Sequence, residues 1–134
     1  MQDRPNFVEL LEAAREFLET EVAPRQTDHR SRFRTLVTIN ALTILDREFR
    51  HEAVIMRDEA LRLVQLLDKQ EELPVDPGRL APIVLELNAE LAARIRRGDP
   101  PPGVLEHLRQ VGAAKLEVAS PQYLKRYQRS ATPV

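Results

Sequence analysis

The sequence predicts an all-α protein, a four- to five-helix antiparallel bundle with a buried central helix. Apolar residues recur at helical spacing through most of the chain, and Pro and Gly gather at a few points between these segments. In addition, the stretch from Thr35 to Leu45 contains no charged residue and has apolar residues on every side of a helix. Such a helix is normally enclosed by others. We therefore expect residues 33–49 to form the central helix.

The composition fits one soluble domain. The chain has 134 residues, 43% of them hydrophobic, and a formal net charge of −1. This charge argues against nucleic-acid binding, and no apolar run is long enough to span a membrane. The N-terminus lacks the apolar core of a signal peptide and there is no cysteine, so we expect a cytoplasmic protein. We predict a single helical domain over residues 1–128 and a disordered tail over 129–134.

The first two helices have recognisable starts. Asn6 and Glu9 have the spacing of a capping box, so the first helix begins there and should end before Pro24. After a polar loop, Thr27 or Asp28 caps the central helix, which runs from about residue 29 to residue 50. No Gly or Pro separates it from a further apolar pattern reaching residue 67. Because a compact bundle needs shorter helices, we place a break near residues 51–54.

The second half of the chain contains two more helices and a short terminal one. Residues 73–82 hold three prolines and a glycine, and the next helix should start close to Pro82 and end at Gly98. The following helix spans about residues 102–119. Tyr123, Leu124 and Tyr127 then predict a short amphipathic turn that docks on the bundle.

The central helix carries the polar residues Arg34, Asn40, Arg47 and Glu48. Asn40 and Arg47 are two turns apart and share a face, with Glu48 next to Arg47. These groups are candidates for binding a ligand or a partner. The alternative is structural: Asn40 bonds to a neighbouring helix, and Arg47 and Glu48 pair with charges on other helices.

The catalytic and metal motifs are incomplete. Glu48 and His51 form an E-x-x-H pair, but a di-iron site needs a second such pair, which the chain lacks. The sequence from His51 also fails the zinc protease motif, because Ile55 stands where the second histidine is required. No nucleophile elbow or Gly-rich phosphate loop is present. We therefore expect no catalytic residue, no metal and no cofactor.

Other charged or aromatic residues have two interpretations each. Arg30 and Arg32, with Arg25 and Arg34 nearby, could bind a phosphate at the start of the central helix; alternatively they neutralise the five glutamates of the first helix. Tyr123 could stack on a base beside Lys125 and Arg126, but docking on the bundle is favoured. Lys115 lies in an otherwise apolar row, so its stem should pack while its ammonium group reaches water or Glu48.

Four segments carry a resemblance to a known family. They are RPNFVELLEAAREFLETEV, FRTLVTINALTILDREFR, LAARIRRGD and HLRQVGAAKLEVASPQYL. Together they resemble a family of small uncharacterised bacterial proteins that are frequently encoded beside aminoglycoside-phosphotransferase-like kinases and acyl-CoA dehydrogenases. The family's recurring polar positions correspond here to Arg34, Asn40, Arg47, Glu48, Lys115, Pro121 and Tyr123. The chain departs from the family pattern at RHEAVIMRDEA, where other members have a looser connection.

The resemblance implies a non-catalytic accessory or protein-interaction subunit, associated with a phosphotransferase-like kinase or an acyl-CoA dehydrogenase. The alternative is a small-molecule binding protein or enzyme that holds an acyl-CoA or a phosphorylated metabolite through the central polar residues. An accessory protein should expose apolar surface. A binding protein should instead line a concave pocket with these residues. The sequence leaves a homo-oligomer open.

Overall fold

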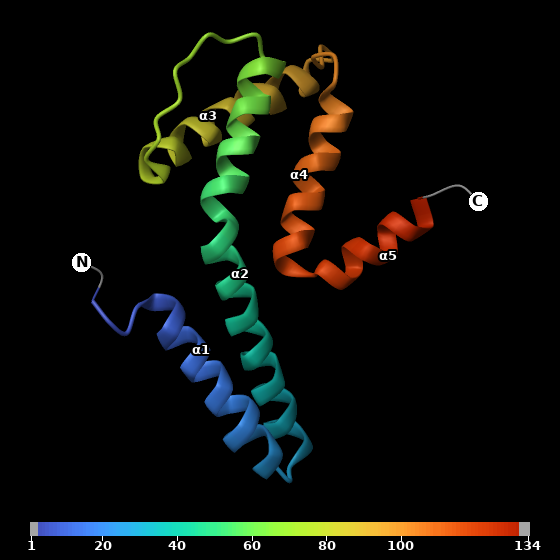
Figure 1. The fold of residues 1–134 in the computed structure, drawn as a ribbon. Coiled ribbons are helices and arrows are strands. Elements are labelled where there is room, and N and C mark those ends of the chain that lie inside the picture. The colour runs from blue at the N-terminus through green and yellow to red at the C-terminus, as the bar shows by residue number, and fades with distance from the viewer. Residues whose placement is uncertain (1–2, 132–134) are drawn as a thin grey trace. The chain divides into compact units, whose positions relative to one another are not determined.

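The computed structural model describes residues 3–131, and this part of the chain is built from α-helices with no strand (Figure 1). The prediction of an all-α protein is therefore confirmed. The helices are α1 (Phe7–Phe17), α2 (His29–Leu66), α3 (Pro77–Arg96), α4 (Val104–Ala119) and α5 (Pro121–Ala131). Helix α5 includes the first three residues of the predicted tail, and residues 132–134 lie outside the described part.

The chain forms two compact units, residues 1–50 and residues 51–134, and α2 contributes to both. The first unit contains α1 and the N-terminal part of α2. The second contains the remainder of α2 with α3, α4 and α5. The single domain over residues 1–128 stays a prediction.

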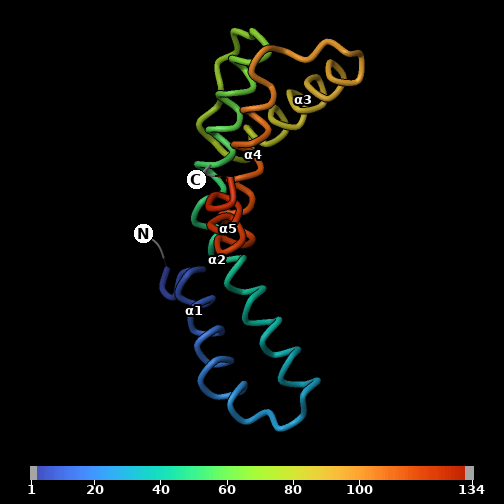
Figure 2. The backbone as a smooth tube through the Cα atoms, turned by 90° about the vertical axis from the view of Figure 1, so that its right-hand side faces the viewer, coloured from blue at the N-terminus to red at the C-terminus, as the bar shows by residue number. Residues whose placement is uncertain are grey.

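In the first unit, α1 and the first part of α2 form an antiparallel hairpin (Figure 2). The predicted capping box is confirmed: the Asn6 side chain accepts a hydrogen bond from the Glu9 amide at 3.0 Å, and the Asn6 amide donates to the Glu9 carboxylate at 2.9 Å. A π-helical turn over Leu18–Val22 and a 3-10 turn over Ala23–Arg25 follow α1. The helical backbone thus includes Pro24 instead of ending before it.

Helix α2 begins at a capping aspartate and is longer than expected. The Asp28 carboxylate accepts a hydrogen bond from the Ser31 amide at 2.9 Å, and this bond lowers the pKa of Asp28. The predicted break near residues 51–54 is wrong, because α2 is helical from His29 to Leu66. No Pro or Gly interrupts the backbone there, and a helix needs such a residue, or an inserted group, to bend sharply.

The prediction of a buried central helix is also wrong for residues 33–49. Within the first unit the described residues are half-buried or exposed, and Asn40 is exposed. A ring contact and an ion pair join the two helices of the hairpin. The rings of Phe7 and Phe49 lie 4.5 Å apart between centroids, and Arg50 contacts the Glu12 carboxylate at 3.0 Å. Two helices can enclose only the strip between them, so the other sides of α2 remain in contact with solvent.

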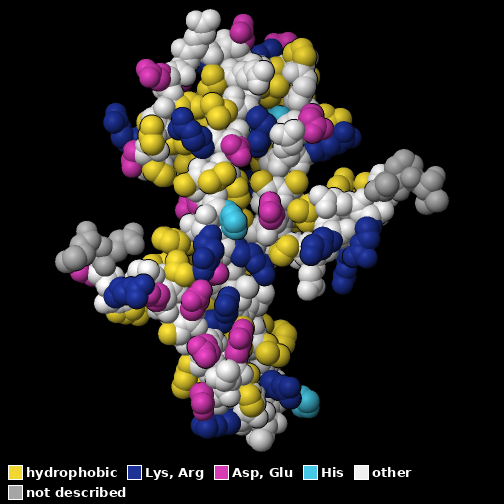
Figure 3. Space-filling view, in the orientation of Figure 1, with side chains coloured by type: hydrophobic (Ala, Val, Ile, Leu, Met, Phe, Trp, Pro, Cys, Tyr) yellow, Lys and Arg dark blue, Asp and Glu magenta, His cyan; other side chains and the backbone are white. Residues whose placement is uncertain are grey.

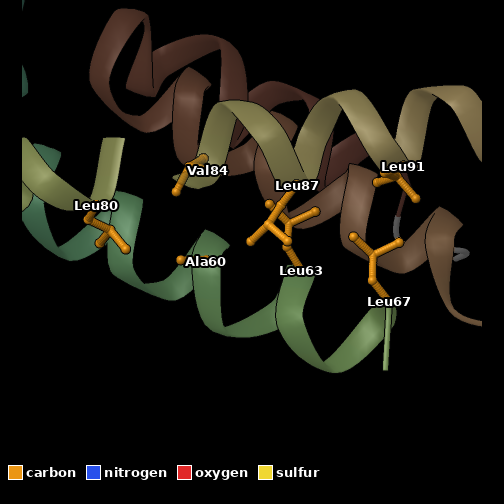
Figure 4. Close-up of a cluster of buried hydrophobic side chains, with 7 residues drawn as sticks. All are labelled: Ala60, Leu63, Leu67, Leu80, Val84, Leu87 and Leu91. Carbon is orange, nitrogen blue, oxygen red and sulfur yellow. The ribbon is translucent and has the colours of Figure 1, made fainter. Parts of the chain in front are cut away.

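The hydrophobic core lies in the second unit, between the C-terminal part of α2 and α3 (Figure 4). Its buried members are Ala60 and Leu63 from α2, Leu67 just after the end of α2, and Leu80, Val84, Leu87 and Leu91 from α3. Ala60 and Leu63 are fully inaccessible to solvent. The spacing of three and four residues on both helices makes two facing stripes. Apolar residues at helical spacing therefore form the side of α3 that faces the core.

The start of α3 differs from the prediction and its end agrees with it. The Asp76 side chain caps the helix by accepting from the Arg79 amide at 3.0 Å, and Pro82 lies inside the helix. Pro82 removes one backbone hydrogen bond, to the carbonyl of Gly78, and both residues are exposed, so water can solvate that carbonyl. After Arg96, Gly98 adopts a positive φ of 76° and ends the helix as predicted.

No helix in the described part of the chain combines the length and the apolar character that crossing a membrane requires.

Candidate functional site

The predicted central polar residues lie on the surface of the hairpin. Arg34, Asn40 and Glu48 are exposed, and Arg47 is half-buried. Because Asn40 contacts solvent, its amide does not need the protein partner that a buried one would need. Arg34, Asn40, Arg47 and Glu48 belong to the first unit, and Lys115 and Tyr123 to the second. Within the first unit, Arg34, Asn40 and Glu48 therefore do not form an enclosed site.

The first unit has two different faces on either side of the line where its helices meet. One is marked by the Glu12–Arg50 ion pair, and we call it the polar face; Leu36, Thr43 and Arg47 share its side of α2 by helical spacing. The other is marked by the Phe7–Phe49 contact. Figure 3 shows this hairpin in the lower part of the view, with charged side chains along its middle and hydrophobic side chains at its edges.

The arginines of the predicted anion-binding site lie on the surface at the start of α2. Arg30, Arg32 and Arg34 are exposed, and among the described residues none of them forms an ion pair. The expected neutralisation by the first helix is seen for Arg25, which contacts Glu21 at 2.9 Å. The three arginines that follow keep their charge on the surface.

A cleft of about 240 Å³ lies between α4 and α5, and we call it the α4–α5 cleft. Tyr123 and Tyr127 are one turn apart on α5 and are 57% and 55% exposed. Both line the cleft with Arg109, Gly112, Ala113, Leu116 and Leu124. A Cβ atom added at Gly112 would meet no heavy atom within 4 Å, so the glycine keeps this space open. Tyr123, a candidate from the sequence, thus lines this cleft.

A second groove, of about 210 Å³, lies between α2 and α4. Its lining mixes both charges with apolar groups: His51, Val54, Ile55, Asp58, Arg62, Gln110, Ala114 and Glu117. Opposite charges in so small a space favour mutual compensation over the binding of an ion. Lys115, on the same helix α4, is exposed and does not line either hollow.

His107 is a buried polar residue that the sequence analysis did not single out. It is 4% exposed, and its two ring nitrogens have no hydrogen-bond partner among the described residues. Burial lowers the pKa of His107, Arg62 lowers it further, and Glu59 opposes this change. The sequence does indicate this burial, because Val104, His107 and Val111 are spaced so that they share one side of α4. Leu105 and Leu108 on the same helix are 60% and 48% exposed.

The described residues contain no group of three or more histidines, cysteines or acids arranged to hold a metal ion. Other polar contacts in the second unit join neighbouring helices: Asn88 donates to the Glu59 carboxylate at 2.8 Å, and Lys69 contacts Glu90 at 2.6 Å. These groups hold α3 to the α2 segment and to the turn that follows it. The α4–α5 cleft, by contrast, brings exposed aromatic groups together with Arg109.

Comparison with protein families gives a match over most of the chain. Residues 25–123 match the model of a domain of unknown function, DUF6285, and the chain belongs to this family. The match includes α2, α3 and α4 and ends at Tyr123 in α5. Comparisons with curated proteins and with solved structures gave no match.

Proposed function

We propose that this protein is a non-catalytic accessory protein that binds a protein partner through the α4–α5 cleft. The observation that supports the proposal is the pair of exposed tyrosines beside Arg109, above a cleft that Gly112 keeps open. Tyr and Arg are the residue types most enriched where interfaces gain their binding energy. A hollow of this kind accepts an apolar anchor from a partner, and the tyrosines close around it.

The charge of α5 indicates the chemistry of the partner. Lys125, Arg126 and Arg129 lie on this helix, and its described residues include no acid. A partner segment with an apolar anchor and flanking carboxylates would complement it, and such complementarity speeds association and selects the partner. The family resemblance suggests a phosphotransferase-like kinase as this partner, with an acyl-CoA dehydrogenase as the alternative.

The rival function, binding of an acyl-CoA or a phosphorylated metabolite by the central polar residues, has less support. Arg34, Asn40 and Glu48 are exposed on a helical hairpin and do not line the α4–α5 cleft or the α2–α4 groove. A small-molecule site normally surrounds most of its ligand. The accessory function is therefore the one that the geometry favours.

The test is recovery of partners with a tagged full-length chain from its native cell, followed by mass spectrometry of proteins and small molecules. We expect stoichiometric recovery of a kinase-like protein. Gly112→Leu should abolish recovery by filling the cleft, whereas Gly112→Ala should keep it, because the space accommodates a methyl group. Recovery of the chain without a protein partner but with a phosphorylated metabolite would contradict the proposal, as would full partner binding by Gly112→Leu.

A further inference from the structure

The first unit presents an apolar face that its own helices do not cover. Five large side chains form it, which we call the hairpin face: Phe7, Leu10 and Phe17 from α1, and Leu45 and Phe49 from α2. Their exposed fractions lie between 47% and 58%. On α1 they recur at intervals of three and seven residues, and on α2 at an interval of four, so each group forms one stripe.

The two stripes lie on the same side of the hairpin. Phe7 and Phe49, one from each stripe, contact each other at 4.5 Å. Glu12 and Arg50 join the same two helices, and Arg50 follows Phe49 directly, so its side chain points about 100° away from that of Phe49. The ion pair thus marks the opposite side. The result is a hairpin with these five apolar side chains on one side and the Glu12–Arg50 ion pair on the other.

The size of the hairpin face is suited to a protein interface. Half-exposed Phe and Leu side chains each offer roughly 100 Å² of apolar surface, so the five members of the face present roughly 500 Å². This is more than half of the roughly 800 Å² that each partner contributes to a standard interface. Isolated patches of this size on a soluble protein mark interaction sites.

We propose that the hairpin face is covered by the same face of a second copy of this chain, so that two hairpins form a four-helix bundle. Two antiparallel helices with one apolar side are half of such a bundle. A self-complementary face that contacts itself also gives a closed two-fold dimer, the commonest oligomer. The five members of the face include no charged residue, and apolar character of this kind is typical of homodimer interfaces.

The charges at the loop end of the hairpin fit the same arrangement. The C-terminal end of α1 and the turn after it carry Glu16, Glu19 and Glu21, of which Glu19 and Glu21 also contact Arg15 and Arg25. Helix α2 starts with Arg30, Arg32 and Arg34. If the two-fold axis runs along the helices, α1 of one copy lies against α2 of the other, and these ends meet. Exposed pairs add little affinity, but they favour this orientation over the one that places like charges together.

The dimer does not depend on the proposed function, because the hairpin face and the α4–α5 cleft share no residue. The experiment is the molar mass of the full chain by light scattering and by sedimentation at several protein concentrations. We expect twice the chain mass of 15.4 kDa, falling toward one chain mass on dilution. A single chain mass at every concentration would overturn the dimer.

Two matched variants identify the face that is used. Leu45 and Leu36 lie on the same helix with nearly equal exposure, 47% and 50%, but on opposite sides of the hairpin. Leu45→Glu should give a single chain mass, because a carboxylate would be buried in the interface. Leu36→Glu, on the polar face, should remain a dimer. Equal masses for the two variants would overturn the assignment to the hairpin face.

A measurement on the unchanged protein guards against misfolding of Leu45→Glu. Amide hydrogen exchange in residues 7–17 and 33–49 should slow as the protein concentration rises, because dimerisation prevents the hairpin from opening. Exchange in residues 80–91 of the core should depend less on concentration. If exchange in the hairpin is independent of concentration while the protein is a dimer, another face forms the dimer and the proposal is wrong.

Discussion

The two ends of α2 differ in what surrounds them. Around Thr35–Leu45 the helix is uncharged and has apolar residues on every side, yet these residues are half-buried or exposed. At the other end, where charged and apolar residues alternate, Ala60, Leu63 and Leu67 are buried against α3. The apolar content of a helix therefore does not determine its burial. Burial is determined by the number of helices that can pack against it. Within the first unit, α1 is the only described α-helix beside the N-terminal part of α2.

The largest expected effect concerns the core of the second unit. Leu63→Ala should lower the free energy of unfolding by about 2 to 5 kcal/mol, because Leu63 is fully buried and the substitution leaves a cavity. Leu85→Ala, at a position that is 71% exposed on α3, is the control and should change it by less than about 0.5 kcal/mol. Chemical denaturation measures both. Similar losses in the two variants would remove the distinction between core and surface.

The next effect concerns His107. Burial lowers the pKa of His107, so protonation of the imidazole favours the unfolded chain. The stability of the folded protein is therefore complete above pH 6.5, the ordinary pKa of histidine, and is lost as the pH falls through the lowered pKa. His107→Leu should raise stability at neutral pH by about 1 kcal/mol, because a buried unpaired polar group is costly. It should also reduce the loss between about pH 7 and about pH 5. Denaturation curves at several pH values check this, and a variant with the pH dependence of the unchanged protein would contradict it.

A smaller effect is expected at the start of α1. Asn6→Ala should lower stability by about 1 kcal/mol, because it removes the side chain that accepts from the Glu9 amide. Asn40→Ala is the control: Asn40 is exposed inside a helix, so the change should be neutral or slightly stabilising. Thermal unfolding followed by circular dichroism measures both. A large loss for Asn40→Ala would restore the buried role first expected for this amide.

The smallest effect is the coupling between Phe7 and Phe49. Replacing each with Leu, singly and together, should give a coupling energy of about 0.5 kcal/mol, at the low end for aromatic pairs because both rings are half exposed. The dilute protein should be used, so that any second copy contributes little. Zero coupling would mean that this ring contact adds no stability of its own to the hairpin.

The sequence predicted those features that depend on neighbouring residues. The capping box at Asn6, the cap at Asp28 and the end of α3 at Gly98 follow from side chains within a few positions of each helix end. The long α2 was also compatible with the sequence, which contains no Pro or Gly from residue 29 to residue 66. The predicted break came from an assumption of compactness and not from a residue that would bend the helix.

The candidate site was predicted only in part, because it depends on how helices distant in the sequence pack together. Tyr123 was found because an aromatic residue on a short amphipathic helix is informative by itself, whereas the cleft beneath it depends on where α4 lies. The sequence analysis selected Arg34, Asn40 and Glu48 because they were expected to be polar residues within a buried helix. The three residues are exposed, so that reason no longer holds.

The sequence by itself determined that the chain is all-helical and where several of its helices begin or end. These properties follow from backbone geometry and the nearest few residues. Only the tertiary structure decided which stripes are buried, because burial depends on helices distant in sequence that pack against them. It placed the core between the end of α2 and α3 and left the hairpin face exposed to solvent.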